Sequence, residues 1–247
     1  MNRIAYMVIR NLFHVPVWFY RLCRMGRITD THTEQEKYNF IRKIVKKVNH
    51  TGRVTVLGSG EENIPTDQGF ILFPNHQGLF DMLAIIEKCP HPIRFVIKKE
   101  LSNVILVKQL IRVMNGMAMD RSDVRASMKI INRMTEDVMN GKNYIIFPEG
   151  TRSKKENQIL DFKAGTFKSA VNAKCPIVPV ALINCYKPFD IPSIKKETVQ
   201  VHFLEPIPYE QYVGLKTREI ADIVHDRIQK KIDENIFKNM LDKPELV

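Results

Sequence analysis

The chain has 247 residues and carries 38 Lys and Arg against 27 Asp and Glu, a formal net charge of +11 at pH 7. Hydrophobic residues make up 44% and charged residues 26%, which excludes a disordered or collagen-like chain and supports one sizeable core. The positive charge favours a polyanion, an anionic membrane or a phosphorylated substrate, and does not choose among the three.

The first 25 residues are typical of an amphipathic helix that lies in a membrane surface. Arginines interrupt an apolar pattern of helical spacing, and the aromatic residues at 18–20 favour the interface. The pattern consists of Ile4, Val8, Leu12, Val15, Phe19 and Leu22. The longest stretch without Lys, Arg, Asp or Glu has ten residues, whereas a spanning helix needs about 20. Pro16 is expected to kink or break the helix.

The basic bias continues through residues 1–50, which hold ten Lys and Arg against three Asp and Glu. Each basic residue beside an anionic leaflet contributes about 1 kcal/mol. We therefore interpret residues 1–50 as a helical, amphipathic membrane-association motif and residues 51–247 as an α/β domain. The alternative is that residues 4–22 pack on the core of that domain.

Beyond a polar linker at 27–36, helix-like and strand-like segments alternate. Strands are expected at 53–57, 69–73, 93–98, 116–119, 144–147, 177–183 and 198–204. Helices are expected at 35–48, 79–88, 101–114, 123–140, 166–173 and 218–241, and Ser122 is expected to cap the fourth of them. The alternation predicts an α/β fold with a largely parallel central sheet flanked by helices.

A histidine and an aspartate follow the strand expected at 69–73, at the sheet edge where reactive groups collect. His76 could take a proton from a hydroxyl near neutral pH, and Asp81 could hold the required tautomer of its ring. Read alone, the pair is weak evidence for catalysis, and a capping histidine with an aspartate at a helix N-terminus is the simpler interpretation.

The segment at 148–153 follows another buried strand and suits a phosphorylated alcohol. Gly150 lets a ligand approach the backbone, Arg152 offers a forked donor for phosphate, and Glu149 can accept from a hydroxyl. A polar turn with a surface salt bridge is the alternative. Arg121 and Lys163 could also face an anion, although an exposed ion pair is the simpler interpretation of each.

Two classes of site are not expected. The four cysteines, Cys23, Cys89, Cys175 and Cys185, form no C-x-x-C pair, so we interpret them as reduced, buried thiols of a cytoplasmic protein rather than a zinc ribbon. No nucleic acid is expected as a partner, because neither a binding motif nor interleaved aromatic residues accompany the basic ones.

Taken in chain order, four motifs resemble the glycerolipid acyltransferase superfamily, most closely its 1-acyl-sn-glycerol-3-phosphate (lysophosphatidate) acyltransferases. They are N-H-x-x-x-x-D at 75–81, G-x-x-x-D-R at 116–121, F-P-E-G-T-R-S at 147–153 and V-P-V at 178–180. The resemblance covers about residues 55–205, and the combination of the first and third motifs makes it specific. Gly78 stands where the family often has serine, and Ala118 and Met119 replace its usual aromatic and branched residues.

The resemblance implies a role for each site residue. His76 would be the general base that activates the acceptor hydroxyl, oriented by Asp81. Pro179 would shape the acyl-donor side. The acceptor site would consist of Arg121, Glu149, Gly150, Thr151, Arg152 and Lys163, with the three basic residues on the phosphate. No metal and no cofactor are expected.

The implied reaction moves a fatty acyl group from acyl-CoA or acyl carrier protein to the sn-2 hydroxyl of lysophosphatidate, giving phosphatidate for phospholipid synthesis. The enzyme is expected to be peripheral or monotopic on the cytoplasmic face of a membrane that contains anionic phospholipids, held there by its N-terminal helical segment. The alternatives are an acyltransferase acting on glycerol-3-phosphate or another lysophospholipid, and a non-catalytic membrane-binding protein, against which the intact His76 and Asp81 argue.

Overall fold

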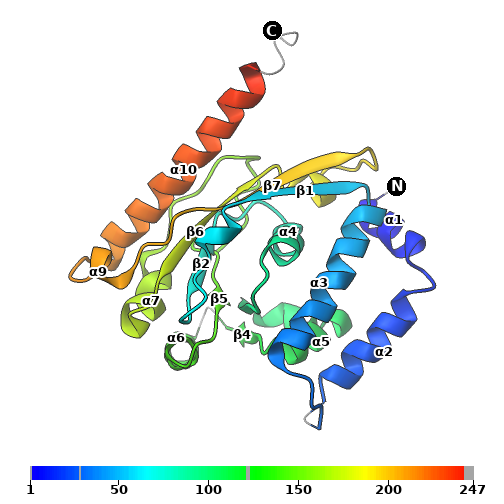
Figure 1. Cartoon of the computed structure of the whole chain (residues 1–247), viewed down its shortest axis with the longest axis horizontal. Coiled ribbons are helices and arrows are strands. Elements are labelled where there is room, and N and C mark those ends of the chain that lie inside the picture. The colour runs from blue at the N-terminus through cyan, green and yellow to red at the C-terminus, as the bar shows by residue number, and fades with distance from the viewer. Residues whose placement is uncertain (1, 28, 121–122, 242–247) are drawn as a thin grey trace.

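The computed structural model describes residues 2–27, 29–120 and 123–241. Within these ranges a seven-stranded sheet in the order β1-β7-β6-β2-β5-β3-β4 lies between two layers of helices (Figure 1). The strands are β1 (Val54–Ser59), β2 (Ile71–Pro74), β3 (Arg94–Lys98), β4 (Met117–Met119), β5 (Tyr144–Ile145), β6 (Ile177–Ile183) and β7 (Glu197–Phe203).

Five neighbouring strands, from β6 to β4, run parallel to one another. β7 is antiparallel to β6, and β1 is parallel to β7, so the remaining edge of the sheet runs in the opposite direction. β2 and β6 are continuous apolar runs, as expected of strands covered on both faces. The prediction of a largely parallel α/β sheet is thus confirmed. Because β2 and β5 run parallel, the segments that follow them emerge at the same edge of the sheet.

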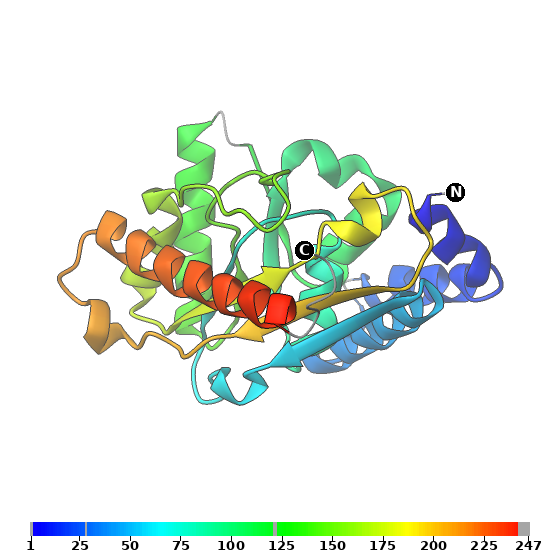
Figure 2. The ribbon, with the colours of Figure 1, turned by 90° about the horizontal axis from the view of Figure 1, so that it is seen from above.

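Each face of the sheet has its own helices and its own hydrophobic cluster. One layer contains α1 (Arg3–Arg10), α2 (Val15–Met25), α3 (Glu34–Thr51), α4 (Asp81–Lys88) and α5 (Ile105–Val113). The other contains α6 (Val124–Met139), α7 (Lys168–Ala173) and α10 (Thr217–Leu241). Figures 1 and 2 show α3 and α10 on opposite sides of the sheet. The short helices α8 (Lys187–Asp190) and α9 (Tyr209–Tyr212) connect elements of the second half of the chain.

Several boundaries differ from the sequence-based expectations. Asp123 is the N-cap of α6, since its side chain accepts from the backbone N–H of Ala126. Ser122, the predicted cap, lies outside the described residues. The helix expected from residue 79 begins at Asp81, and the one expected from residue 101 starts as a 3-10 turn, with its α-helical part from Ile105. Cys23 is half-buried rather than buried, whereas the other three cysteines are buried; all four are free.

The N-terminal segment forms two helices with a break at residues 11–14. Pro16 lies in the first turn of α2, where its missing N–H costs no helical hydrogen bond. Asn11 supports the break, because its side-chain amide donates to the carbonyl of Met7 (2.8 Å) and to Thr51 Oγ1 (2.7 Å). The interruption expected from Pro16 is present, although α1 already ends at Arg10.

One side of α1 and α2 packs on the core and the other is exposed. Met7, Leu22 and Met25 are buried in the cluster that α3 and α4 share. The exposed apolar face comprises Ile4, Val8, Ile9, Leu12, Phe13, Val15, Val17 and Tyr20. No helix among the described residues is both long enough and apolar enough to cross a membrane.

Arg3 links α1 to two distant parts of the chain. Its side chain is buried and donates to the backbone oxygens of Gly52 (2.7 Å), Pro188 (3.1 Å) and Lys195 (2.8 Å). Glu197 Oε1 lies 4.0 Å from the same guanidinium. Because Pro188 belongs to α8, the first helix is directly attached to that segment.

We expect Arg3→Met to lower the free energy of unfolding by about 3 kcal/mol, because three carbonyl oxygens would lose a charged donor. Urea denaturation measures this change. Arg10→Met, on the exposed side of the same helix, is the matched control and should shift stability by less than about 0.5 kcal/mol. Equal unfolding midpoints for the two variants would contradict the role given to Arg3.

Candidate functional site

A hydrogen-bonded His76–Asp81 pair lies just beyond the end of β2. His76 Nδ1 and Asp81 Oδ2 are 2.7 Å apart. Asp81 is the buried first residue of α4, and its carboxylate also accepts from the backbone N–H groups of Gln77 (2.7 Å) and Gly78 (3.1 Å). The two residues singled out by their spacing in the sequence therefore lie in contact.

This carboxylate selects the tautomer of the histidine. An ionised carboxylate only accepts, so Nδ1 carries the shared proton and Nε2 is left as an acceptor. Burial raises the pKa of Asp81, against the opposing effect of its hydrogen bonds to His76, Gly78 and Gln77. The His76 ring stacks on Phe147 with centroids 4.1 Å apart, and its side chain is 22% exposed. Such a ring can take a proton from a hydroxyl that reaches Nε2.

Side chains hold the loop that carries His76. Asn75 accepts from the backbone N–H of Leu182 (2.7 Å) and donates to its carbonyl (3.1 Å), which ties the end of β2 to β6. Gln77 accepts from the backbone N–H of Cys185 (2.7 Å). Asn75 was noted only as part of the N-H-x-x-x-x-D motif and Gln77 was given no role, because their partners lie far away in the sequence.

Glu149 supports the same loop from the side of β5. It is 2% exposed, and its two oxygens accept from the backbone N–H groups of His76 (2.7 Å) and Leu160 (3.2 Å). Burial raises the pKa of its carboxyl to about 7. The sequence suggested that Glu149 accepts from a substrate hydroxyl; in the structure its oxygens bind the main chain.

Gly150, the residue after Glu149, lies against the side chain of Lys163. Gly150 has a φ of +70°, and a Cβ there would lie 2.7 Å from Lys163 Nζ. The left-handed backbone favours glycine here, whereas the flexible lysine side chain could move aside. Lys163 and the neighbouring Thr151 are exposed.

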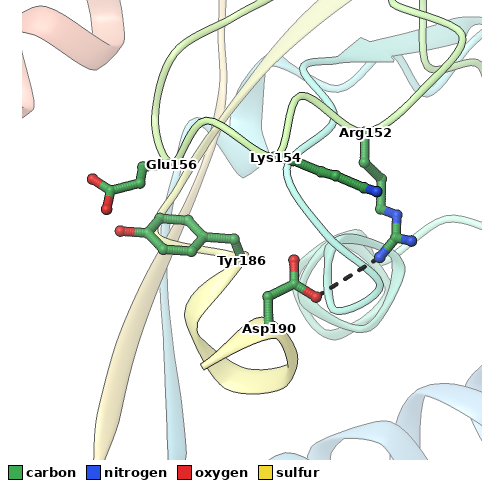
Figure 3. A pocket seen from close by; sticks show the side chains of 5 residues that line it. All are labelled: Arg152, Lys154, Glu156, Tyr186 and Asp190. Carbon is green, nitrogen blue, oxygen red and sulfur yellow. Dashed lines mark ion pairs between the residues drawn. The ribbon is translucent and has the colours of Figure 1, made fainter. Parts of the chain in front are cut away.

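A cavity of about 240 Å³ adjoins the His76 loop (Figure 3). It is lined by Arg152, Lys154, Glu156, Tyr186 and Asp190. Arg152 Nη1 lies 3.7 Å from Asp190 Oδ1. A Cβ on Gly78 would lie 3.2 Å from Asp190 Oδ2, so the wall of the cavity touches the loop two residues after His76.

Of this cavity, only Arg152 was predicted as a site residue. Lys154 directly follows the F-P-E-G-T-R-S motif and could have been included on its charge. Tyr186 is the N-cap residue of α8 and Asp190 is the last residue of that helix. No periodicity in the sequence predicts a helix of four residues.

The other predicted residues lie apart from the cavity or outside the described ranges. Arg121 lies outside them, and its neighbour Asp120 is 3.3 Å from Lys99. Pro179 is buried within β6, opposite Phe73 of β2. Over the described part of the chain, no group of three or more His, Cys, Asp or Glu side chains could hold a metal ion.

Comparisons with known proteins identify similar chains. Residues 53–183 match a family described as acyltransferase. The 1-acyl-sn-glycerol-3-phosphate acyltransferase of Saccharomyces cerevisiae is 30% identical over 184 residues, which cover 71% of this chain and 59% of that protein. The protein of the same name from Haemophilus influenzae is 29% identical over 187 residues, covering 72% and 77%. This chain thus spans about three-fifths of the yeast relative.

A solved structure shares the fold. The crystal structure of the 1-acyl-sn-glycerophosphate (LPA) acyltransferase, PlsC, from Thermotoga maritima superimposes with a TM-score of 0.71 at 25% sequence identity. The match covers 92% of this chain and 95% of that one. The likeness therefore extends well beyond the residues of the family match.

The pKa of Glu149 predicts a pH-dependent stability. Because burial raises that pKa from 4.5 to about 7, the contribution of this group is complete below about pH 4.5 and is lost as the pH rises through about 7, by about 3 kcal/mol in all. Glu149→Gln removes this titration, so between pH 5 and 8 the unmodified protein should lose stability relative to the variant. Denaturation of both proteins at matched pH measures the difference, and parallel profiles would contradict the assignment.

Proposed function

The chain belongs to the acyltransferase family, and we propose that it transfers a fatty acyl group from an acyl thioester to the sn-2 hydroxyl of 1-acyl-sn-glycerol-3-phosphate. The relatives that bear this activity in their names supply the choice of reaction. The observation that carries the proposal is the 2.7 Å contact between His76 and Asp81, next to a cavity lined by two basic and two acidic side chains. The product is phosphatidate, a precursor of phospholipids.

In the proposed mechanism, Nε2 of His76 removes the proton of the acceptor hydroxyl as its oxygen attacks the thioester carbonyl. Asp81 stabilises the imidazolium that forms. The tetrahedral intermediate then collapses, the C–S bond breaks, and the thiolate leaves as the thiol with the proton from His76. The thioester is already activated, so no acyl-enzyme is needed. The donor, acyl-CoA or acyl carrier protein, acts as a substrate, and the scheme uses no cofactor and no metal.

The acceptor phosphate is proposed to bind in the cavity of Figure 3. Arg152 and Lys154 bring two positive charges to a lining that also contains the acids Glu156 and Asp190. The Arg152 guanidinium lies 3.7 Å from the Asp190 carboxylate. A phosphate dianion offers that guanidinium stronger, forked hydrogen bonds. At about 240 Å³ the cavity is smaller than the roughly 300–1,000 Å³ of sites that enclose a whole drug-sized ligand. It therefore suits a glycerol phosphate headgroup, with the acyl chains outside.

The remaining predicted residues receive supporting roles. Lys163 lies against Gly150 and is proposed, with Thr151, to line the approach of the phosphate. Arg121 remains a predicted phosphate ligand. Glu149 is proposed to act through His76, whose backbone it holds, rather than on the substrate.

The exposed apolar face of α1 and α2 is proposed to lie in the surface of a membrane, on its cytoplasmic side, as a peripheral or monotopic anchor. A second apolar group, which the sequence did not single out, supports it. Leu101, Val104, Ile105 and Leu106 are exposed at the start of α5, a helix that contacts α2. A lipid acceptor with one acyl chain partitions into such a surface.

Acyl transfer from radiolabelled acyl-CoA, and in parallel from acyl carrier protein, tests the reaction. Three acceptors are compared in detergent: lysophosphatidate, glycerol-3-phosphate and lysophosphatidylcholine. Each acceptor is assayed with each of the two donors. Labelled phosphatidate from lysophosphatidate is the expected product, and the donor that supports it identifies the carrier. Transfer to glycerol-3-phosphate alone would contradict the proposed acceptor.

We expect His76→Ala to lower kcat by at least 10²–10⁴-fold, because the general base is lost. Asp81→Asn should also lower kcat, since an amide no longer favours the same histidine tautomer. His32→Ala, which removes an exposed histidine remote in sequence, is the control and should retain activity. Retention of most of the kcat by His76→Ala would rule out the mechanism.

Arg152→Gln should raise the KM for lysophosphatidate by about 10–100-fold and change kcat less, because about 1.5–3 kcal/mol of charged hydrogen bonding is lost in ground state and transition state alike. Initial rates at varied acceptor concentration separate the two constants. Arg133→Gln, an exposed arginine on α6, is the matched control. An unchanged KM in Arg152→Gln would remove this side chain from the phosphate site.

A further inference from the structure

A second and larger cavity lies between α2 and α3. Its volume is about 470 Å³, roughly twice that of the cavity beside His76. It is lined by His14, Trp18, Arg21, Phe40, Lys43, Ile44 and Lys47. The positions 14, 18 and 21 recur on one side of α2 and its N-cap, and 40, 43, 44 and 47 on one side of α3. The groove is therefore formed where one face of each helix meets the other.

The charge of this groove is entirely positive. Arg21, Lys43 and Lys47 line it, and none of the three takes part in an ion pair among the described residues. The Arg21 guanidinium lies over the ring of Phe40, 4.8 Å from its centroid. Three like charges gathered on aromatic walls repel one another, so an anion in the groove would relieve the repulsion.

The groove opens beside the exposed apolar face. Phe13, Val17 and Tyr20 are 90%, 56% and 61% exposed, and each precedes a residue that lines the groove. One residue is a rotation of about 100° around a helix, so the apolar stripe and the groove are neighbouring faces of α2. A molecule in the groove would have apolar chains beside that stripe.

We propose that the groove between α2 and α3 binds the phosphate headgroup of an anionic phospholipid of the membrane on which the enzyme sits. The inference rests on the proposed membrane association. The phosphate would lie among Arg21, Lys43 and Lys47, and the acyl chains would run along the exposed stripe into the leaflet. The ligand is a bilayer lipid rather than free phosphate because the charged groove and the apolar stripe share one helix. The site is separate from the cavity of Arg152, so it would select the membrane and not the substrate.

Trp18 provides a direct readout, because it is the single tryptophan of the chain and lines the groove. Dihexanoyl phosphatidylglycerol, used below its micelle concentration, should shift the Trp18 emission. Dihexanoyl phosphatidylcholine and inorganic phosphate at the same concentration should not. A shift with inorganic phosphate but not with the lipid would overturn the proposal. A shift with coenzyme A but not with the lipid would also overturn it, because the groove would then bind the nucleotide of the donor.

Paired variants separate a site from diffuse charge. The double variant Lys43→Gln and Lys47→Gln should bind anionic vesicles at least tenfold more weakly than the unmodified protein does. The vesicles contain phosphatidylcholine with about 20% phosphatidylglycerol. The control, Lys129→Gln with Lys230→Gln, removes the same charge from α6 and α10 on the other face of the sheet. Equal losses in the two double variants would overturn the proposal.

The activity assay distinguishes this inference from the proposed reaction. In detergent, the Lys43 and Lys47 double variant should keep the kcat and KM of the unmodified enzyme, and a large loss there would overturn the separate role of the groove. If the unmodified protein transfers no acyl group but still shows the Trp18 shift with the lipid, the result would count against the proposed reaction and support the lipid site.

Discussion

A carboxylate withdrawn from water must find hydrogen-bond donors or give up its charge, and this constraint on Asp81 shapes the region around it. The donors are the His76 ring and two backbone N–H groups of the following turn. Glu149, which follows the neighbouring parallel strand β5, imposes the same requirement, and the backbone N–H groups of His76 and Leu160 meet it. The histidine is thus held twice, by its ring and by its main chain, each time by a buried acid.

The features that could be predicted from the sequence are those that depend on the local pattern of residues. The apolar runs of β2 and β6 and the alternation of segments predicted the parallel sheet, and the five-residue spacing predicted the contact of His76 with Asp81. The reversed direction of β7 could not be predicted, because an apolar run carries no sign of strand direction. The main-chain contacts of Glu149 were missed for a similar reason: the residue type is visible in the sequence, but its burial is not.

Long-range partners account for the rest. Asp190 and Tyr186 reach the cavity because Gln77 and Asn75 bind the segment at the end of β6, and no spacing in the sequence encodes that approach. The groove between α2 and α3 is similar: both helices were predicted near their observed positions, but their contact faces become known only when they pack. Local periodicity therefore predicts elements, and tertiary contacts determine which side chains share a site.

Arg3 gives the N-terminal helices a different status from that of a removable anchor. The residue reaches from α1 to the backbone of Gly52, Pro188 and Lys195, and α8 in turn carries the acid that faces Arg152. An exchange of anchoring segments between proteins by recombination would leave that wall without its donors, unless the incoming helix presented a guanidinium at the same point. Arg3 thus makes the N-terminal helices and the domain that carries His76 parts of one unit, which we expect to be inherited together.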